Sequence, residues 1–175
     1  ASVFFAVILA LLMRSMQTGY YDYSIDASVR MYTGYIQVHG KDYWEKKSLD
    51  ESMVLDQKHL KELQNTAEVN LIVPRFETYS LISHGNKTKV VQITGINPEL
   101  ENKLTDLKKK LVSGKFLSDS SKGIIVAQGL AEILKVDVGD SVVIYGQGYH
   151  GVTAAAQIPI VGIVKFTLPE LNKSF

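Results

Sequence analysis

The strongest chemical pattern in the chain is Gly146-Gln147-Gly148-Tyr149-His150-Gly151, which has the G-x-G-x-x-G spacing of dinucleotide-binding loops. In such loops a helix begins at once and its first turn approaches a pyrophosphate. Here the next residues include Gln157-Ile158-Pro159-Ile160-Val161, which alternate and would place a proline inside the helix. The pattern therefore predicts a flexible hairpin tip. If it is exposed, Tyr149 and His150 are candidate contacts for a partner, because mobile loops commonly carry contact residues.

Other side chains that could do chemistry do not form a catalytic or metal-binding pattern. The four histidines, His39, His59, His84 and His150, show no H-x-x-x-H spacing, and the chain has no cysteine. Neither G-x-S-x-G nor a Walker A sequence is present. The carboxylates of Asp50, Glu51 and Asp56 are interpreted as caps or solvent-facing groups. We expect no catalytic residue, cofactor or metal, and any dependence on ATP would come from another chain.

Composition limits the remaining classes. The chain has 175 residues with 46% apolar content, enough to bury one good core or two small ones. Nineteen basic residues balance eighteen acidic ones, so no field attracts nucleic acid. The only basic run, Lys108 to Lys110, is interpreted as a solvated helix face.

The N-terminal residues Ala1 to Met13 form an apolar run that is too short to cross a bilayer by itself but fits the outer half of a truncated span. The alternative, a buried core helix of a soluble protein, stays open on pattern alone. Beyond this run, one apolar stripe continues at helical steps of three and four, which predicts a stalk that Gly34 ends and in which Gly19 permits a kink. The predicted coupling residues of this stalk are Met16, Tyr20, Tyr23 and Ala27.

Local periodicity predicts the strands and helices that position the candidate contact residues. Alternation predicts a strand at 35–39, and the short apolar run stopped by Pro74 predicts another at 69–73. Residues 41–50 are expected to form a loop pinned by Tyr43 and Trp44. A helix is expected over 56–64, and a hairpin over 75–82 and 89–94 turning at Gly85-Asn86.

In the second half of the chain, the boundaries of the predicted helices and strands are more clearly indicated by the sequence. Asn97 as a cap and Pro98 at the first position predict a helix that continues through Leu111 to Gly114. Further predictions are a strand at 123–127, a helix at 128–134, a turn at 138–140 and strands at 141–145 and 152–166, with Pro159 at an edge or a bulge. The fold class is α+β, with mixed or antiparallel sheets and short helices forming two small lobes over an N-terminal stalk.

Four stretches together resemble the extracytoplasmic domain of ABC transporter permeases of the MacB/FtsX-like superfamily, most like the LolC/LolE lipoprotein-release type. They are MRSMQTGYYDYSIDASVRMYTGYIQVHG (Met13 to Gly40), VQITGINPELE (Val91 to Glu101), LVSGKFLSDSSKGIIVAQGLAEILKVDVGDSVVIY (Leu111 to Tyr145) and IPIVGIVKFTLPELNKSF (Ile158 to Phe175). They span nearly the whole chain in the family's order, although no identifiable loop matches the one by which a lipoprotein-release permease hooks its chaperone.

The resemblance implies a non-enzymatic domain that couples ATP-driven movement to lipoprotein release or substrate export in the bacterial inner membrane. Residues 1–33 would be the end of the first membrane helix and the stalk, and residues 34–175 the periplasmic domain. The implied partners are a cytoplasmic ABC ATPase, a second permease subunit, an envelope substrate such as a lipoprotein, and a periplasmic chaperone. Trp44 is the alternative contact region to the hairpin tip. An independent soluble binding module or enzyme remains the second hypothesis.

Overall fold

The computed structural model describes residues 2–175, and side chains for all of these except residues 26–28, 30 and 31. The chain divides into two compact units, Ala1–Gln37 and Val38–Phe175. Each unit is described by itself below.

The first unit consists mainly of one long helix. Helix α1 (Ser2–Ser28) passes through Gly19 without interruption and ends in the π-helical turn η1 (Val29–Thr33). Its window Ser2–Ile25 has a mean hydropathy of 1.5, is long and apolar enough to cross a membrane, and has none of its residues buried within the chain. A core helix would bury most of such a stripe. The core-helix alternative is therefore not supported, and the predicted helix is confirmed.

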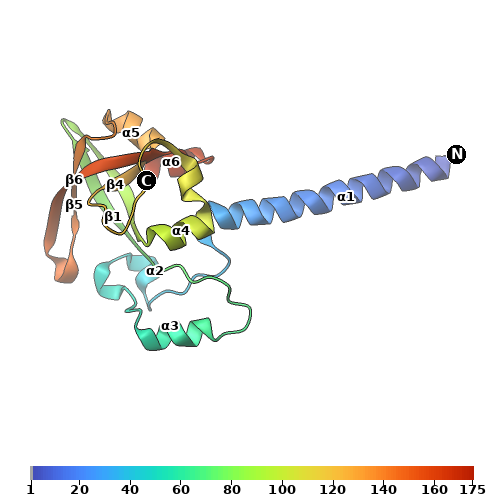
Figure 1. Ribbon diagram of the computed structural model, residues 1–175, viewed down its shortest axis with the longest axis horizontal. Helices are drawn as coiled ribbons and strands as arrows, with labels where there is room; N and C mark the ends of the chain where they lie inside the picture. The colour runs from blue at the N-terminus through green and yellow to red at the C-terminus, as the bar shows by residue number, and fades with distance from the viewer. Residues whose placement is uncertain (1) are drawn as a thin grey trace. The chain divides into compact units, whose positions relative to one another are not determined.

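The second unit is built on a curled mixed sheet of six strands (Figure 1). The strands are β1 (Arg75–His84), β2 (Lys87–Ile96), β3 (Leu111–Gly114), β4 (Ile124–Ala127), β5 (Ser141–Gln147) and β6 (Thr153–Val164). Antiparallel neighbours follow the order β2-β1-β5-β6-β3, and β4 pairs with β6 in parallel. The α+β prediction with mixed sheets is confirmed.

Strand β6 joins the two parts of the sheet. Its residues 153–159 pair with β5, whereas residues 160–164 pair with β3 and β4. Pro159 lies opposite Ser141, the first residue of β5, and the register of β4 shifts immediately afterwards. Proline cannot donate to a ladder, so its place beside this irregularity agrees with the prediction.

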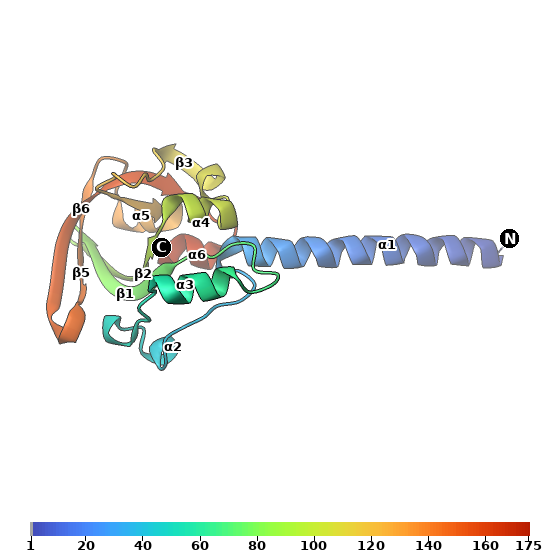
Figure 2. The ribbon, with the colours of Figure 1, turned by 60° about the horizontal axis from the view of Figure 1, so that its bottom comes forward.

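Short helices surround the sheet (Figure 2). They are α2 (Tyr43–Lys46), α3 (Gln57–Gln64), α4 (Pro98–Thr105), α5 (Gln128–Leu134) and α6 (Pro169–Ser174), together with the 3-10 turns η2 (Leu49–Glu51), η3 (Leu107–Lys110) and η4 (Tyr149–Gly151). Helices α3 and α4 begin where the caps predict. The Asp56 side chain accepts a hydrogen bond from the amide of His59, and the Asn97 side chain accepts one from the amide of Leu100.

The hydrophobic core lies between α5 and the sheet. Its buried members are Ile82, Val91, Val126, Leu130, Ala131, Leu134, Val136, Val142, Ile160 and Ile163. A second cluster of Ala127, Val164 and Phe166 holds Leu107, Leu111, Ile125, Leu171 and Phe175 against it. Helix α6 is thereby fixed to α5 and β4.

Two predicted strands are wrong. Residues 35–39 and 69–73 have no regular structure, although both segments alternate or are apolar. Tyr35, Ile36 and Val38 are exposed. Alternation marks residues that suit a strand, but a strand forms only where a neighbouring edge accepts its hydrogen bonds. The predicted loop at 41–50 instead contains the short helix α2 and the turn η2.

The helix that begins at Pro98 ends earlier than predicted. Thr105 is its last residue, because Asp106 adopts the left-handed conformation with φ 51° and its amide bonds to the carbonyl of Asn102. Residues 111–114, assigned to the helix by their leucine spacing, pair with β6 instead. The leucine at 111 therefore serves the second hydrophobic cluster from a strand.

Candidate functional site

The G-x-G-x-x-G segment forms the tip of the β5–β6 hairpin, as predicted. The amide of Gly148 donates to the carbonyl of Val152 at 2.7 Å, and strand β6, not a helix, follows. A phosphate loop would require the helix N-terminus that is missing here. The side chain of Tyr149 is 58% exposed, and its ring centroid lies 3.9 Å from that of His150. Both predicted contact residues are therefore accessible on one turn.

A second loop holds this tip in place. The backbone amide of His150 donates to Asp50 Oδ1 at 2.9 Å across 100 residues of sequence, and Nδ1 of the His150 ring lies 3.8 Å from the same oxygen. Sequence reasoning predicted a flexible tip and did not foresee this attachment. The contact is exposed, with 74% of the His150 side chain and 36% of the Asp50 side chain open to solvent.

We call the segment from residue 40 to residue 53 the Trp44 loop. Its two ends touch, because a Cβ added to Gly40 would lie 2.5 Å from the carbonyl oxygen of Glu51. Compact surface loops with adjacent ends are Ω-loops, which are frequently functional. Lys46 Nζ lies 2.5 Å from Glu51 Oε1, and the hydrogen bond and charge of Glu51 raise the pKa of Lys46. The loop therefore has its own internal contacts.

Trp44 lies on the outside of this loop. Its side chain is 60% exposed, Lys47 Nζ lies 4.1 Å from its ring centroid, and the ring of His39 lies 4.9 Å away. A cation over an indole face is favourable and leaves the rest of the ring available for contact. The structure thus brings the loop of Trp44 and the tip of Tyr149 together through Asp50 and His150.

The Trp44 loop is fastened to the edge of β1. The hydroxyl of the buried Tyr43 donates to the carbonyl of Glu77 and accepts from its amide, while Lys47 Nζ lies 3.2 Å from the Glu77 carboxylate. Strand β5 pairs with β1 only over 81–83, so Tyr43 substitutes for a strand at an edge that β5 leaves. Covering an open edge in this way prevents unwanted strand pairing.

A shallow depression lies where β1 and β5 separate. Its volume is about 340 Å³, and it is lined by Tyr79, Ser80, Leu81, Val90, Tyr145, Gly146, Gln147, Gly151 and Thr153. Tyr79 and Tyr145 remain 56% and 50% exposed. Sequence reasoning did not select these tyrosines. The available signal was alternation, since Ile82 and Val142 are buried and their strand neighbours must face outward.

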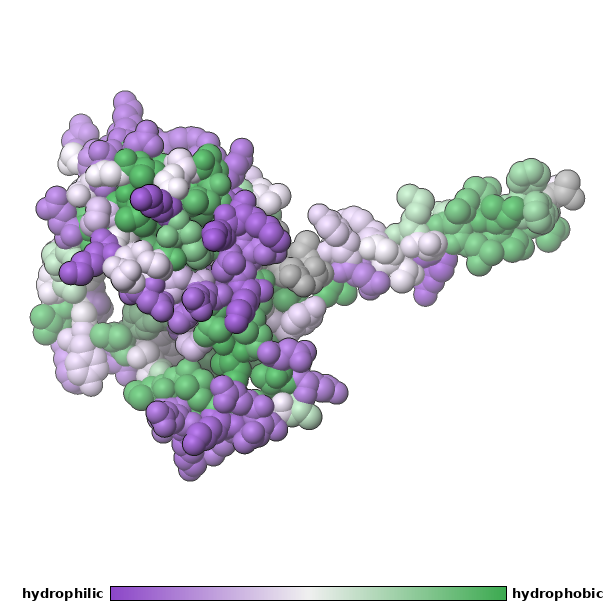
Figure 3. Space-filling view, in the orientation of Figure 1, coloured by the Kyte–Doolittle hydropathy of each residue, from purple (hydrophilic) through white to green (hydrophobic). Residues whose placement is uncertain are grey.

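The predicted stalk residues lie on helix α1. Met16, Tyr20 and Tyr23 are 76%, 69% and 73% exposed, and their spacing places them on one stripe. The side chain of Ala27 lies outside the described residues. Figure 3 shows the first half of α1 as strongly hydrophobic and the second half as mixed. Contact of this stripe with another helix stays a prediction.

The buried ion pair of Arg75 and Glu101 has a structural role. Arg75 Nε and a terminal guanidinium nitrogen donate to the two carboxylate oxygens of Glu101 at 2.7 and 2.6 Å, and the hydroxyl of Thr105 donates to Glu101 Oε1 at 3.1 Å. This bidentate pair fixes α4 to the start of β1. Among the side chains that the structure describes, no group of three or more His, Cys, Asp or Glu residues could hold a metal ion.

Comparisons with known proteins identify relatives. No protein-family model matches the chain. The lipoprotein-releasing system transmembrane protein LolC of Neisseria meningitidis is 32% identical over 120 residues, covering 63% of this chain and 28% of that protein. The corresponding LolE of Haemophilus influenzae is 29% identical over 87 residues, covering 46% of this chain and 20% of that protein.

Among solved structures, the extracellular domain of the noncanonic ABC-type transporter YknZ from Gram-positive bacteria gives a TM-score of 0.49 at 16% identity, covering 65% of this chain and 59% of that chain. The matched region spans less than a third of either curated relative. The predicted resemblance to the extracytoplasmic domain of MacB/FtsX-like permeases of the LolC/LolE type is confirmed by the curated relatives.

Proposed function

We propose that this chain is the extracytoplasmic part of an ABC transporter permease of the bacterial inner membrane, which couples ATP-driven movement to lipoprotein release or substrate export and has no enzymatic activity of its own. The similarity to LolC over 120 residues carries the proposal. The exposed apolar stretch Ser2–Ile25 of helix α1, 24 residues long, supports it because it suits a membrane anchor.

In this proposal the two parts of the chain have different tasks. Residues 1–33 end the first membrane helix and form the stalk, and residues 34–175 form the periplasmic domain. The partners are a cytoplasmic ATPase, a second permease subunit, a lipoprotein or another envelope substrate, and a periplasmic chaperone. Lipoprotein is the preferred substrate class because both curated relatives are named for lipoprotein release.

The decisive experiment uses the full-length permease with its ATPase and second permease subunit in proteoliposomes loaded with a lipoprotein. We expect ATP to release the lipoprotein to a soluble acceptor. Omitting the permease that contains this chain should abolish release. Full release without it would contradict the proposal, and ATP-dependent loss of a peptide instead of the lipoprotein would change the substrate class.

Within that assembly the stalk residues Met16, Tyr20, Tyr23 and Ala27 are proposed to transmit movement. Replacing Tyr23 with Asp puts a charge on the proposed helix contact and should uncouple ATP hydrolysis from release. Asp22→Asn, an adjacent change on the helix, is the matched control. Normal coupling with Tyr23→Asp would remove the role of this stripe.

The contact surface is proposed to comprise Tyr149, His150 and Trp44. All three are exposed, and the Asp50 contact with His150 joins the two loops that carry them. A photoreactive residue at Tyr149 or Trp44 should give adducts with substrate or chaperone during turnover, whereas one at Gln64 on α3 should not. Adducts only at Trp44 would leave the hairpin tip as a connector.

A further inference from the structure

A gap in strand pairing lies between β1 and β5. Strand β5 extends to Gln147, but it pairs with β1 only over residues 81–83. The next residues are still close, because a Cβ added to Gly146 would lie 2.6 Å from Ser80 Oγ. Beyond them the two strands separate, and the depression of about 340 Å³ lies in the space between them.

The edge of β1 along this gap carries main-chain groups that need partners. In an antiparallel strand, successive residues direct their amide and carbonyl toward opposite neighbours. Both main-chain groups of Glu77 bond to the Tyr43 hydroxyl, and Leu81 pairs with Tyr145 of β5. Tyr79, midway between Glu77 and Leu81, therefore faces the same edge. Among the described residues, no strand pairs with Tyr79 on this side.

The Tyr43 hydroxyl shows what kind of partner this edge accepts. It donates to the carbonyl of Glu77 and accepts from its amide, the latter at 2.9 Å. A residue of a neighbouring antiparallel strand would make the same two bonds. Strand-like contacts thus lie on both sides of Tyr79, from Tyr43 at Glu77 and from β5 at Leu81. The position between them is open for one more extended segment.

Strand β5 provides the opposite wall of the gap. Because Leu81 pairs with Tyr145, the same alternation makes Gln147 face β1. One residue of an added chain could therefore bond to the main chain of Tyr79 on one side and of Gln147 on the other. Addition of a strand to an open edge is a common way in which proteins bind extended peptides.

The outer face of the sheet gives this gap an apolar floor. The register aligns Val90, Leu81 and Tyr145 in one row across β2, β1 and β5. All three line the depression together with Tyr79, and all four are exposed. Exposed aromatic and aliphatic side chains that adjoin one another mark surfaces that bind other proteins.

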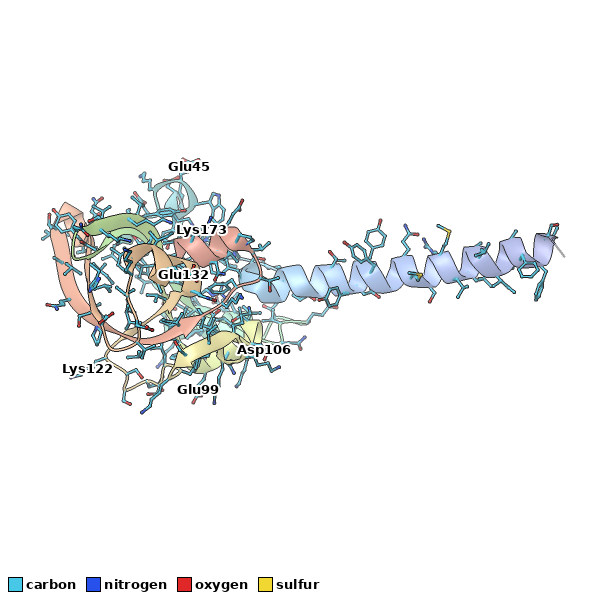
Figure 4. The ribbon with its side chains drawn as sticks, turned by 90° about the horizontal axis from the view of Figure 1, so that it is seen from above. Glu45, Glu99, Asp106, Lys122, Glu132 and Lys173 are labelled. Carbon is cyan, nitrogen blue, oxygen red and sulfur yellow. The ribbon has the colours of Figure 1, made fainter. Side chains whose placement is uncertain are left out.

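None of the side chains that line the depression carries a charge, although 21% of the chain is charged. The polar members of the lining are serine, threonine and glutamine. The charged side chains labelled in Figure 4 belong instead to helices and loops around the sheet, and they are Glu45, Glu99, Asp106, Lys122, Glu132 and Lys173. A charged ligand would lose its hydration here without gaining an opposite charge.

We infer that the depression binds a short, extended and uncharged segment of another polypeptide, which adds as a strand between β1 and β5. A fatty acyl chain would also suit the apolar floor, but it would cover the main-chain groups of Tyr79 without bonding to them, which costs free energy. A peptide supplies both a donor and an acceptor. This inference goes beyond the proposed function, since it requires neither ATP nor a particular placement of the domain over the membrane.

The test uses the full chain held through α1 in nanodiscs of phosphatidylcholine. The probe is the peptide acetyl-Thr-Val-Ser-Val-Thr-amide, and calorimetry measures its binding against empty nanodiscs. We expect the peptide to bind and to slow hydrogen exchange at the amide of Tyr79. Exchange at the amide of Ser80, which faces β2, should stay unchanged. Replacing both valines of the peptide by N-methylvaline removes the donors of one edge and should weaken binding at least about tenfold.

Variants of the protein test the aromatic walls. Tyr79→Ala and Tyr145→Ala should each weaken peptide binding at least about tenfold, as truncation of a central aromatic contact does. Val112→Ala, on β3 at the other end of the sheet, also truncates an exposed strand residue and should bind the peptide like the unaltered chain. Unchanged melting temperatures would show that the variants are folded, and the N-methylated peptide needs no variant.

Several outcomes would overturn the inference. They are no binding at millimolar peptide, equal binding of the N-methylated peptide, and equal effects of Tyr79→Ala and Val112→Ala. Displacement of the peptide by N-decanoyl glycinamide without a change in exchange at Tyr79 would assign the depression to an acyl chain. Self-association of the chain that Tyr79→Ala abolishes would assign it to a second copy.

The test needs no ATPase, lipoprotein or chaperone. Failure of the peptide to bind, with normal ATP-dependent release, would therefore reject only this inference. Conversely, absence of ATP-dependent release with normal peptide binding would reject the proposed transport function and leave the peptide site in place.

Discussion

Two polar contacts of similar chemistry connect distant segments of the second unit, and their surroundings differ completely. Arg75 and Glu101 join β1 to α4 with side chains only 10% and 6% exposed, whereas His150 and Asp50 join the hairpin tip to the Trp44 loop with 74% and 36% exposed. Breaking a buried pair leaves a charge without solvent, whereas water replaces the partner of an exposed one. The first contact therefore belongs to the stability of the fold, and the second can change without unfolding it.

The largest loss of stability is expected when the buried Arg75–Glu101 pair is broken. Arg75→Ala should destabilise the protein by about 3–5 kcal/mol, because the Glu101 carboxylate would remain buried without its guanidinium. Chemical denaturation of the full chain measures this change. The double variant Arg75→Leu with Glu101→Leu should recover much of the loss. If the single variant cost no more than an exposed pair does, the contrast in burial would carry no energetic meaning.

The next largest loss of stability is expected where α6 packs against α5. A Cβ on Gly129 would lie 2.7 Å from the carbonyl oxygen of Asn172, so Gly129→Ala must push α6 away from α5. We expect a loss of about 1–3 kcal/mol, as for other overpacked sites. Hydrogen exchange should rise at the amides of Ala127 and Phe166, which bond to Phe175 and Asn172. Gly19→Ala, where nothing lies within 4 Å, is the control.

Tyr43 is intermediate between the buried Arg75–Glu101 pair and the exposed Asp50–His150 contact, because its side chain is buried but it belongs to the surface-exposed Trp44 loop. Tyr43→Phe removes the hydroxyl that bonds to both backbone groups of Glu77. The expected loss is about 1–3 kcal/mol, the cost of leaving buried polar groups unsatisfied. Denaturation together with exchange at the Glu77 amide would check it. The hydroxyl of Thr78 also donates to the carbonyl of Lys47 at 3.3 Å. A neutral result would mean that this bond and the contact of Lys47 Nζ with Glu77 hold the loop to β1 without the Tyr43 hydroxyl.

The half-buried Lys110 predicts a small dependence of stability on pH. Burial lowers its pKa in the folded state below the ordinary value of 10.5. Between the lowered pKa and 10.5 the unfolded chain binds more protons, so this residue makes stability rise with pH in that window, whereas at neutral pH the burial cost is fully present. Lys110→Met should therefore raise the melting temperature at neutral pH and flatten the alkaline slope. A lower melting temperature at neutral pH would contradict this.

The smallest effect on stability is expected when the exposed contact between Asp50 and His150 is broken. Asp50→Ala should change the free energy of unfolding by less than about 0.5 kcal/mol, as surface substitutions usually do. It should nevertheless increase hydrogen exchange at the amide of His150, whose acceptor is removed. Asp119→Ala on a different loop should leave that amide unchanged. Unaltered exchange at His150 in Asp50→Ala would show that the hairpin holds its own tip.

Local signals were sufficient for much of the fold. The caps Asp56 and Asn97 start their helices as predicted, the turn Gly85-Asn86 joins β1 to β2, and helix α5 has the predicted bounds. Each of these features depends on hydrogen bonds within a few residues or on the left-handed conformation that glycine permits, so neighbouring sequence contains the information. The apolar stripe of α1 could likewise be predicted from neighbouring residues, because it depends only on the spacing of apolar side chains along one helix.

Tertiary structure decided what local patterns left ambiguous. Residues 35–39 alternate but pair with no strand among the described residues, whereas residues 111–114 have helical leucine spacing but pair with β6. The candidate site depends on the same kind of information, because Asp50 meets His150 across 100 residues and Tyr43 meets Glu77 across 34. The sequence by itself determined which segments are apolar, capped or glycine-rich. Only the folded chain determined which edges were open, since an edge exists only after distant strands have paired.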